Sequence, residues 1–506
     1  MREATTATGD SLPAPSAQPT RLPPGARLAL SLGSLAVIAL VGGRWLLHVY
    51  DAFHTIAGRY DFSTYYAAAY ALRLDPHANI YNPVVLVRAG AAAHVLVQPP
   101  LAYTYPPLFA ILLSPFTLFS FQVLSRLWLA FNAALWLAVT LLLARELSIF
   151  VGSVGRSGTP MQAGAQPVAL ISRARRLLRD NPGPLLALAL SVWLCLTSAP
   201  ADQTLVTGQI NFLVLLPLVL VLPLTRRGHE RWTGVMIALA AILKFTPALL
   251  ILYLVLRRRW QAALAAVGTL AALTALSALV VGPSVTLAAI PQALHVGTGD
   301  AALGHNEALL GPLYRALGQG PGEPGLLLYG VLAVMLVLIW LWLGIAIWRA
   351  ARPGPNATSG TQYLLHLVPY AIALCGLLLL APTAWVHHYV WVLPAAAIAL
   401  GWAAGTVFVT LGTPALRTSF ASLALVVLAC VLLNWGQPYD WDTNPHPTQT
   451  HFLGLPLWPG LLLLRGLAAG LLFMYLTFFD LRVRRSQAIA RQRDHRRPHG
   501  AEATRK

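Results

Sequence analysis

Residues 57–81, with the sequence AGRYDFSTYYAAAYALRLDPHANIY, follow shortly after the first apolar segment and contain the most informative pattern in the chain. Asp61 stands at the head of an expected helix. Phe62, Tyr65 and Tyr66 recur at helical spacing on one face of that helix. Such a helix is amphipathic and is expected to lie flat on a membrane surface, with its apolar face in the lipid. Asp61 would then be held at the boundary between lipid and water, which indicates a lipid-borne substrate.

The composition predicts an integral membrane protein, with the lipid bilayer as a partner. The hydrophobic fraction is 57% and the charged fraction is 10%. Apolar segments of roughly 20 residues, the length that crosses a bilayer, recur along the chain. The net charge is +18, but the basic residues gather in the tails and in alternate loops, which is the positive-inside pattern. Nucleic acid is therefore not expected as a partner.

The charge pattern also divides the chain into parts. Arg21 and Arg27 precede the first span, which places the N-terminus in the cytoplasm. Both termini are expected there, with the protein crossing the plasma membrane several times. The expected parts are a disordered cytoplasmic tail at 1–27, an integral membrane domain at 28–480 with its first span at 28–47 and a large first extracytoplasmic loop at 48–106, and a basic cytoplasmic tail at 481–506.

The apolar segments predict an all-α polytopic membrane protein with about 10–12 transmembrane helices. Residues 107–119 are expected to form a short re-entrant helix before a full span at 124–144. Residues 234–256 have arginines on both sides, so we expect a helical hairpin that turns at Pro247. The other spans are expected at 184–199, 209–224, 261–281, 326–347, 363–381, 389–409, 419–434 and 457–479.

Lys244 lies in the middle of an apolar segment, where a charge usually faces a cavity or a partner. At the outward tip of the expected hairpin it could bind a phosphate, although a lysine there could also snorkel to the interface. His387 and His388 begin a later span beside Trp385. One of them could donate a hydrogen bond to a phosphate or a leaving group, or both could be interfacial histidines.

Asp61 has two possible roles. An aspartate is a favoured helix N-cap, and a carboxylate at this position could also be a general base that deprotonates an acceptor hydroxyl. Arg315 could contact phosphate in a bidentate manner. The predicted topology places Asp61, Gln209, Lys244, Arg315 and His388 on the same side of the membrane.

Metal binding is not expected. The D-x-D in YDWD (439–442) could bind a divalent cation, but this pattern often occurs by chance. The three cysteines fall in apolar segments and predict neither a disulfide framework nor a thiolate metal site. We expect neither a metal nor another cofactor.

Six motifs occur in order around successive spans: DFSTYYAAAYAL, YTYPPL, GQINFL, LKFTPALL, NEALLGPLYR and PTAWVHHYVWVLP. Together they resemble the polytopic glycosyltransferase family 87, over about residues 28–410. The resemblance implies a GT-C-like fold and an inverting transferase. Such an enzyme would move a hexose, with mannose favoured, from a polyprenyl-phosphate donor to a lipid or glycan acceptor on the extracytoplasmic face. The sequence departs from the family pattern at Ala308, where a small hydroxyl residue is usual.

The resemblance also implies roles for single residues. Asp61 matches the catalytic acid of the family, and His388 matches its phosphate-coordinating histidine, with His387 as the competitor. Lys244 and Arg315 fall on basic positions of the pattern and are candidates for binding the donor phosphate. The candidates for contact with a substrate are Tyr65, Tyr105, Gln209, Asn211, Asn306 and Trp385.

A transporter or flippase of a lipid-linked sugar is the alternative. It predicts charged residues at mid-bilayer and an inverted repeat. The polar candidates instead collect at one interface, which favours an enzyme. A ligase or polymerase of lipid-linked glycans would share much of this chemistry.

Overall fold

The computed structural model describes most of the chain between its two tails. Within the described residues, the only strands are the short antiparallel pair β1 (Thr450–Phe452) and β2 (Leu455–Leu457); everything else that is regular is helical. The described residues are 22–55, 61–95, 103–154, 182–299, 306–308, 326–349, 359–379, 381, 383–411, 415–434, 450–452, 455–457, 466 and 468–477.

The prediction of an all-α polytopic membrane protein is confirmed. The described part of the chain contains five helices that are long and apolar enough to cross a membrane, and a bent pair of helices with an angle of 53° could be a sixth. Several further apolar helices of 10–17 residues accompany them, and the expected number of 10–12 crossings stays a prediction. The long ones are α1 (Pro24–Thr55), α5 (Phe121–Val154), α12 (Trp260–Val281), η3 (Val386–Val392) joined to α17 (Leu393–Val409), and α18 (Leu416–Asn434); the bent pair is α7 (Gly183–Leu196) and α8 (Ala199–Thr207).

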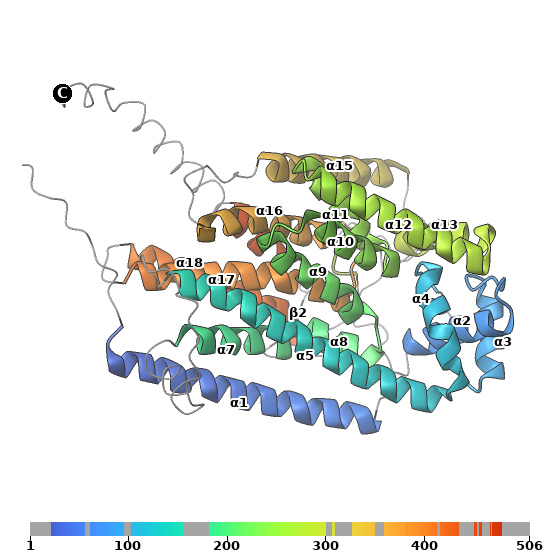
Figure 1. The fold of residues 1–506 in the computed structure, drawn as a ribbon, viewed down its shortest axis with the longest axis horizontal. Helices are drawn as coiled ribbons and strands as arrows, with labels where there is room; N and C mark the ends of the chain where they lie inside the picture. Colours follow the sequence, from blue (N-terminus) through green and yellow to red (C-terminus); the bar gives the residue numbers. More distant parts are fainter. Residues whose placement is uncertain are drawn as a thin grey trace, which may run out of the picture.

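The remaining helices include those that carry the candidate site. Figure 1 shows α2, α3 and α4 gathered at one end of the long helices α1 and α5. The expected short helix at 107–119 is present as α4 followed by a 3₁₀ turn. The bounds are α2 (Asp61–Leu74), α3 (Pro83–Ala92), α4 (Pro107–Leu113), η1 (Ser114–Leu118), α9 (Asn211–Arg226), α10 (Glu230–Leu243), η2 (Thr246–Ala248), α11 (Leu249–Leu256), α13 (Pro283–Gly299), α15 (Leu326–Arg349) and α16 (Ser359–Leu379).

Helix α2 begins at Asp61 as predicted. The prediction that its apolar face lies in the lipid at the membrane surface is wrong. Ten of its fourteen residues are buried inside the protein, so no broad apolar face is left for the lipid. The ring of Phe62 stacks on Trp128 at 5.5 Å, and the hydroxyl of Tyr66 donates to the carbonyl of Phe119 at 2.9 Å. The helical spacing of the aromatic residues therefore reflects packing against α5 and the turn before it.

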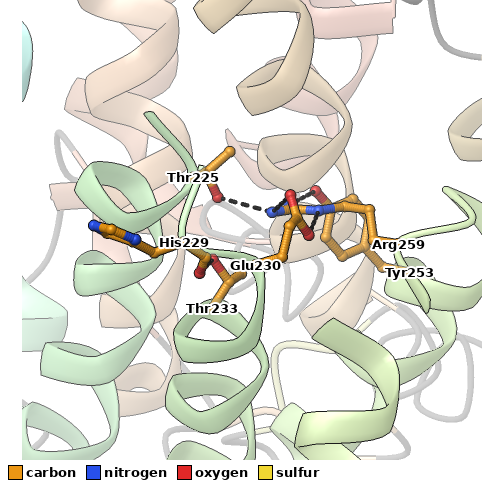
Figure 2. A network of polar contacts seen from close by, with 6 residues as sticks. All are labelled: Thr225, His229, Glu230, Thr233, Tyr253 and Arg259. Carbon is orange, nitrogen blue, oxygen red and sulfur yellow. Dashed lines mark hydrogen bonds and ion pairs between the residues drawn. The ribbon is translucent and has the colours of Figure 1, made fainter. Parts of the chain in front are cut away.

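The segment around Lys244 forms the expected hairpin. Helix α10 ends at Leu243, Lys244 has extended backbone angles, and η2 and α11 lead back. Arg259, three residues after α11, donates from Nε and Nη2 to both carboxylate oxygens of Glu230 at 2.8 Å each, as Figure 2 shows. Because Glu230 is the first residue of α10, this fork-shaped ion pair fixes the two ends of the hairpin side by side.

The guanidinium of Arg259 has further partners in the same network. It donates to the hydroxyl of Tyr253 and to that of Thr225, at 3.3 Å in both cases. Thr225 belongs to α9 and Tyr253 to α11, so one cation joins the three helices α9, α10 and α11. The network lies at the end of α10 opposite to Lys244.

Helices α10 and α12 pack closely where Gly234 faces α12. A Cβ atom at Gly234 would overlap the backbone carbonyl of Ala262 and approach the amide nitrogen of Ala266 to 3.0 Å. Both alanines are buried. Only glycine allows the two backbones to come this near, which is how small residues act at helix interfaces in membranes.

Gly234→Ala is therefore expected to destabilise the protein. The added methyl group meets backbone atoms that cannot rotate away, and overpacking of this kind costs about 1–3 kcal/mol in the free energy of unfolding. Thermal unfolding of the full-length protein in detergent measures the effect. Gly268→Ala is the control, since a Cβ there meets nothing within 4 Å. Equal unfolding temperatures for both variants would contradict the proposed contact.

Candidate active site

The carboxylate of Asp61 is held by an amide from a distant part of the chain. Nε2 of Gln209 donates to Oδ2 of Asp61 at 2.5 Å. Asp61 is half-buried at the start of α2, and Gln209 is buried just before α9. Two residues that the sequence placed on the same side of the membrane are thus in direct contact.

Two tyrosine hydroxyls surround the other end of the same amide. The hydroxyls of Tyr65 and Tyr105 lie 2.8 and 2.9 Å from Oε1 of Gln209, and 2.8 Å from each other. Tyr65 is on α2, one helical turn after Asp61, and Tyr105 belongs to the YTYPPL motif. The hydroxyl of Tyr81 donates to the backbone carbonyl of Tyr105 at 2.9 Å and holds that motif in place.

The cationic part of the site is built around Lys244. Its ammonium nitrogen lies 3.1 Å from Oδ1 of Asn211 and 2.7 Å from Nε2 of His388. The same nitrogen lies 5.2 Å from the ring centroid of Tyr105 and 5.4 Å from that of Trp391. Lys244 therefore contacts the ring of a tyrosine whose hydroxyl bonds to Gln209, the partner of Asp61.

The two adjacent histidines contribute different groups. The imidazole of His388 faces Lys244, accepts the backbone N–H of Trp385 at 3.2 Å and stacks on Trp391 at 5.2 Å. His387 instead offers its backbone carbonyl, which accepts from Nδ2 of Asn211 at 3.2 Å. The hydrogen bonds thus bring the side chain of His388, and the main chain of His387, to the cluster.

Asn306 links its own segment to the one that carries the histidines. Its Oδ1 accepts the backbone N–H groups of Ala308 and Ala384, at 3.0 Å each. The hydroxyl of Tyr389 donates to the carbonyl of Glu307 at 2.7 Å. Residues 306–308 are thereby fastened to the segment that carries the histidines. Arg315 and the two aspartates of YDWD lie outside the described residues.

Burial and neighbouring groups act in opposite directions on the pKa of the Asp61 carboxyl group. Burial raises the pKa of its carboxyl to about 6, while the bond from Gln209, the charge of Lys244 and the hydroxyl of Thr207 oppose that rise. The carboxylate form is therefore present above about pH 6, and the group can take up a proton near neutral pH. This is the range in which a general base is most effective.

Two contributors to the site were not identified from the sequence. Thr207 lies two residues before Gln209 and stabilises the carboxylate of Asp61. Trp391 stacks on His388 and contacts the charge of Lys244. The only signal in the sequence for Trp391 is its spacing, since it follows His388 by three residues and so shares its side of a helix.

The arrangement combines one base with a neighbouring cationic, hydrogen-bonding group. Asp61 can accept a proton, and the side chains of Lys244 and His388 can contact an anion. A cation between two aromatic rings and an imidazole resembles a phosphate site more than a metal site, because an ammonium group repels metal ions. The geometry therefore fits a reaction in which one group loses a proton while another leaves as an anion.

The titration of Asp61 can be measured directly. The carbonyl band of its protonated carboxyl group is expected to appear in infrared difference spectra as the pH falls through about 6, because burial favours the neutral form. The band should be missing in Asp61→Asn. Loss of the same band in Asp75→Asn, which removes an exposed carboxylate from the same loop, would show that the assignment to Asp61 is wrong.

Comparison with known proteins relates the chain to a glycosyltransferase family. Residues 103–368 match glycosyltransferase family 87. A polyprenol-phosphate-mannose-dependent α-(1-2)-phosphatidylinositol mannoside mannosyltransferase of Mycobacterium tuberculosis is 31% identical over 360 residues, covering 70% of this chain and 72% of the relative. A polyprenol-phosphate-mannose-dependent α-(1-2)-phosphatidylinositol pentamannoside mannosyltransferase of Mycolicibacterium smegmatis is 27% identical over 356 residues, covering 68% and 71%. No solved structure matches.

Proposed function

Since the chain belongs to glycosyltransferase family 87 and is a membrane glycosyltransferase that uses a polyprenyl-phosphate sugar, we propose that it transfers a hexose, with mannose favoured, to a lipid or glycan acceptor on the extracytoplasmic face. The relatives named above support mannose as the sugar and a phosphatidylinositol mannoside as the class of acceptor. The single observation that carries the proposal is that Asp61 and Lys244 belong to one cluster, joined through Gln209 and Tyr105.

In the proposed reaction Asp61 is the general base. It takes the proton of an acceptor hydroxyl, whose oxygen attacks the anomeric carbon of the donor sugar. The bond between that carbon and the phosphate oxygen breaks, and its electron pair leaves with the polyprenyl phosphate. A single displacement inverts the anomeric carbon. The hydrogen bond from Gln209 supports this role, because it favours the ionised carboxylate that the step requires.

Lys244 and His388 are the proposed contacts for the donor phosphate. Negative charge develops on the phosphate as the sugar–oxygen bond breaks, and fixed hydrogen-bond donors stabilise that charge. The ammonium nitrogen of Lys244 and Nε2 of His388 lie 2.7 Å apart, which supports a ligand shared by both side chains. A phosphate ester is already a good leaving group, so the proposed step needs no metal. Arg315, which is in the matched region, stays a predicted additional contact.

The proposed lipid tail lies beside the hairpin. An apolar pocket between α11, α15 and α16 is lined by Leu249, Leu252, Leu256, Trp340 and Leu343, among others. Helix α11 follows Lys244 through the 3₁₀ turn η2 and exposes Leu249 and Leu252, so the proposed prenyl chain would run over the apolar surface of this helix.

The proposed orientation of the protein in the membrane rests on the distribution of its basic residues. The loops around Arg226, Arg227 and Arg257 are basic and are expected in the cytoplasm, together with both termini. The ion pair between Glu230 and Arg259 lies at that end of α10, and Lys244 lies at the other end. This supports an active site on the extracytoplasmic side of the plasma membrane.

Asp61→Asn is expected to lower the rate of transfer by about 10²–10⁴-fold, because the amide cannot accept the hydroxyl proton. Purified full-length protein in lipid nanodiscs, with labelled polyprenyl-phosphate mannose and a phosphatidylinositol mannoside acceptor, measures the rate. Binding of the donor should persist. Asp75→Asn, which changes an exposed aspartate of the same loop, is the control. Near-wild-type transfer by Asp61→Asn would overturn the assignment of the base.

Lys244→Gln separates donor binding from chemistry. The variant keeps a polar side chain but removes the cation, so the donor is expected to bind at least about 10-fold more weakly, which corresponds to a lost charge-assisted hydrogen bond. Equilibrium binding of polyprenyl-phosphate mannose to the nanodiscs measures the change. Unchanged donor affinity, with movement of the lipid across the membrane and no transfer, would favour a flippase instead.

A further inference from the structure

Gln209 is not free to act as a simple substrate contact, because both ends of its amide are already bonded within the protein. Nε2 donates to Asp61, and Oε1 faces the hydroxyls of Tyr65 and Tyr105. The residue is only 3% exposed. A buried amide with partners at both ends is more suited to holding its neighbours than to exchanging them for a ligand.

The direction of the amide follows from the chemistry of its partners. A tyrosine hydroxyl can donate or accept, so Tyr65 and Tyr105 would tolerate either end of Gln209. An ionised carboxylate only accepts. At the 2.5 Å separation between Gln209 and Asp61, a carbonyl oxygen beside the carboxylate would be repelled, and the NH₂ group must face it. Each tyrosine can then direct its single proton toward Oε1.

The backbone of Gln209 is fixed as firmly as its side chain. Gly208 ends α8 in the left-handed region at a φ of 70°. The N–H of Gln209 bonds to the carbonyl of Thr204 at 3.0 Å, and that of Gly208 to Leu205 at 3.2 Å, which together make a Schellman motif. The carbonyl of Gly208 in turn accepts from Nε1 of Trp128 at 2.7 Å.

Trp128 connects the two residues through the core. Its ring stacks on Phe62, the neighbour of Asp61, at 5.5 Å, while its indole N–H bonds to the neighbour of Gln209. One side chain of α5 therefore sets the positions of both partners. Little freedom remains in the separation between the amide and the carboxylate.

We propose that Gln209 is a positioning residue for the base, oriented by Tyr65 and Tyr105, and that it keeps Asp61 ionised and aimed at the acceptor hydroxyl. This inference rests on the proposed function of Asp61. The N–H of Gln209 occupies Oδ2 and stabilises the charged carboxylate against its burial. In the reaction the proton of the acceptor therefore goes to the remaining oxygen, Oδ1.

The test is the pH dependence of kcat/KM in the nanodisc transfer assay. The acid limb of the wild-type profile is expected at about pH 6. Gln209→Leu keeps the size of the side chain and removes the hydrogen bond, so the limb should move upward by about one pH unit. Gln209→Glu places a second carboxyl group beside that of Asp61. The two groups would titrate as a coupled pair, which should move the acid limb further toward higher pH. In both variants the rate should recover as the pH rises.

Tyr105→Phe and Tyr66→Phe form a matched pair of substitutions. Tyr105→Phe removes a hydroxyl that orients Gln209 and should move the acid limb in the same direction, by less. Tyr66→Phe also removes a hydroxyl, but one that bonds to the backbone of Phe119, and it should leave the limb in place. A purely structural role for Gln209 would lower the rate equally at every pH.

The outcomes separate this inference from the proposal on which it rests. If Asp61→Asn abolishes transfer while both variants of Gln209 keep the wild-type acid limb, the positioning role is wrong and the base assignment stands. If Asp61→Asn transfers sugar normally, the proposed function itself fails. Loss of transfer in Asp61→Asn with an upward shift of the limb in Gln209→Leu and Gln209→Glu supports both.

Discussion

The hydrogen bond between Gln209 and Asp61 is the constraint on which the rest of the site depends. It joins residues that are 148 positions apart in the chain. A carboxylate that is taken out of water is unfavourable unless a partner compensates its charge, and the amide of Gln209 is such a partner at 2.5 Å. Trp128 of α5 contacts the neighbours of both residues. The bond between Gln209 and Asp61 therefore depends on how α2 and α8 pack against α5.

The buried charge of Lys244 also has compensating partners. Lys244 is placed at a break between helices, where its nitrogen reaches Asn211 and His388. Asn211 uses the other end of its amide to hold the backbone of His387. Asn211 and His388 thus each have one bond to Lys244 and another to the backbone, an arrangement that keeps these groups in place before a substrate arrives.

Much of the scaffold could be predicted from the sequence, because its signals are local. The start of α2 at Asp61 follows from helical spacing, and the hairpin follows from the arginines that flank it on both sides. The surroundings of α2 could not be predicted, since the same spacing of Tyr65 and Tyr66 suits burial in lipid or in protein. The bond from Gln209 to Asp61 could not be predicted either. An amide pairs equally well with a substrate or a carboxylate, and only tertiary packing determines which partner it has. Of the residues assigned to one side of the membrane, Asp61, Gln209, Lys244 and His388 are therefore found in one cluster, although their partners differ from those expected.

The ion pair between Glu230 and Arg259 has a consequence for how deep the chemistry takes place. Helix α10 has 14 residues, which at about 1.5 Å per residue amounts to a length of roughly 21 Å. The hydrocarbon interior of a bilayer is about 30 Å thick. In the orientation proposed above, with the base of the hairpin at the cytoplasmic boundary, the ammonium group would stop short of the opposite headgroups by roughly the difference between these lengths. A charged ligand that reaches Lys244 must descend below the headgroup level, or the bilayer must be thinned around the protein to meet it.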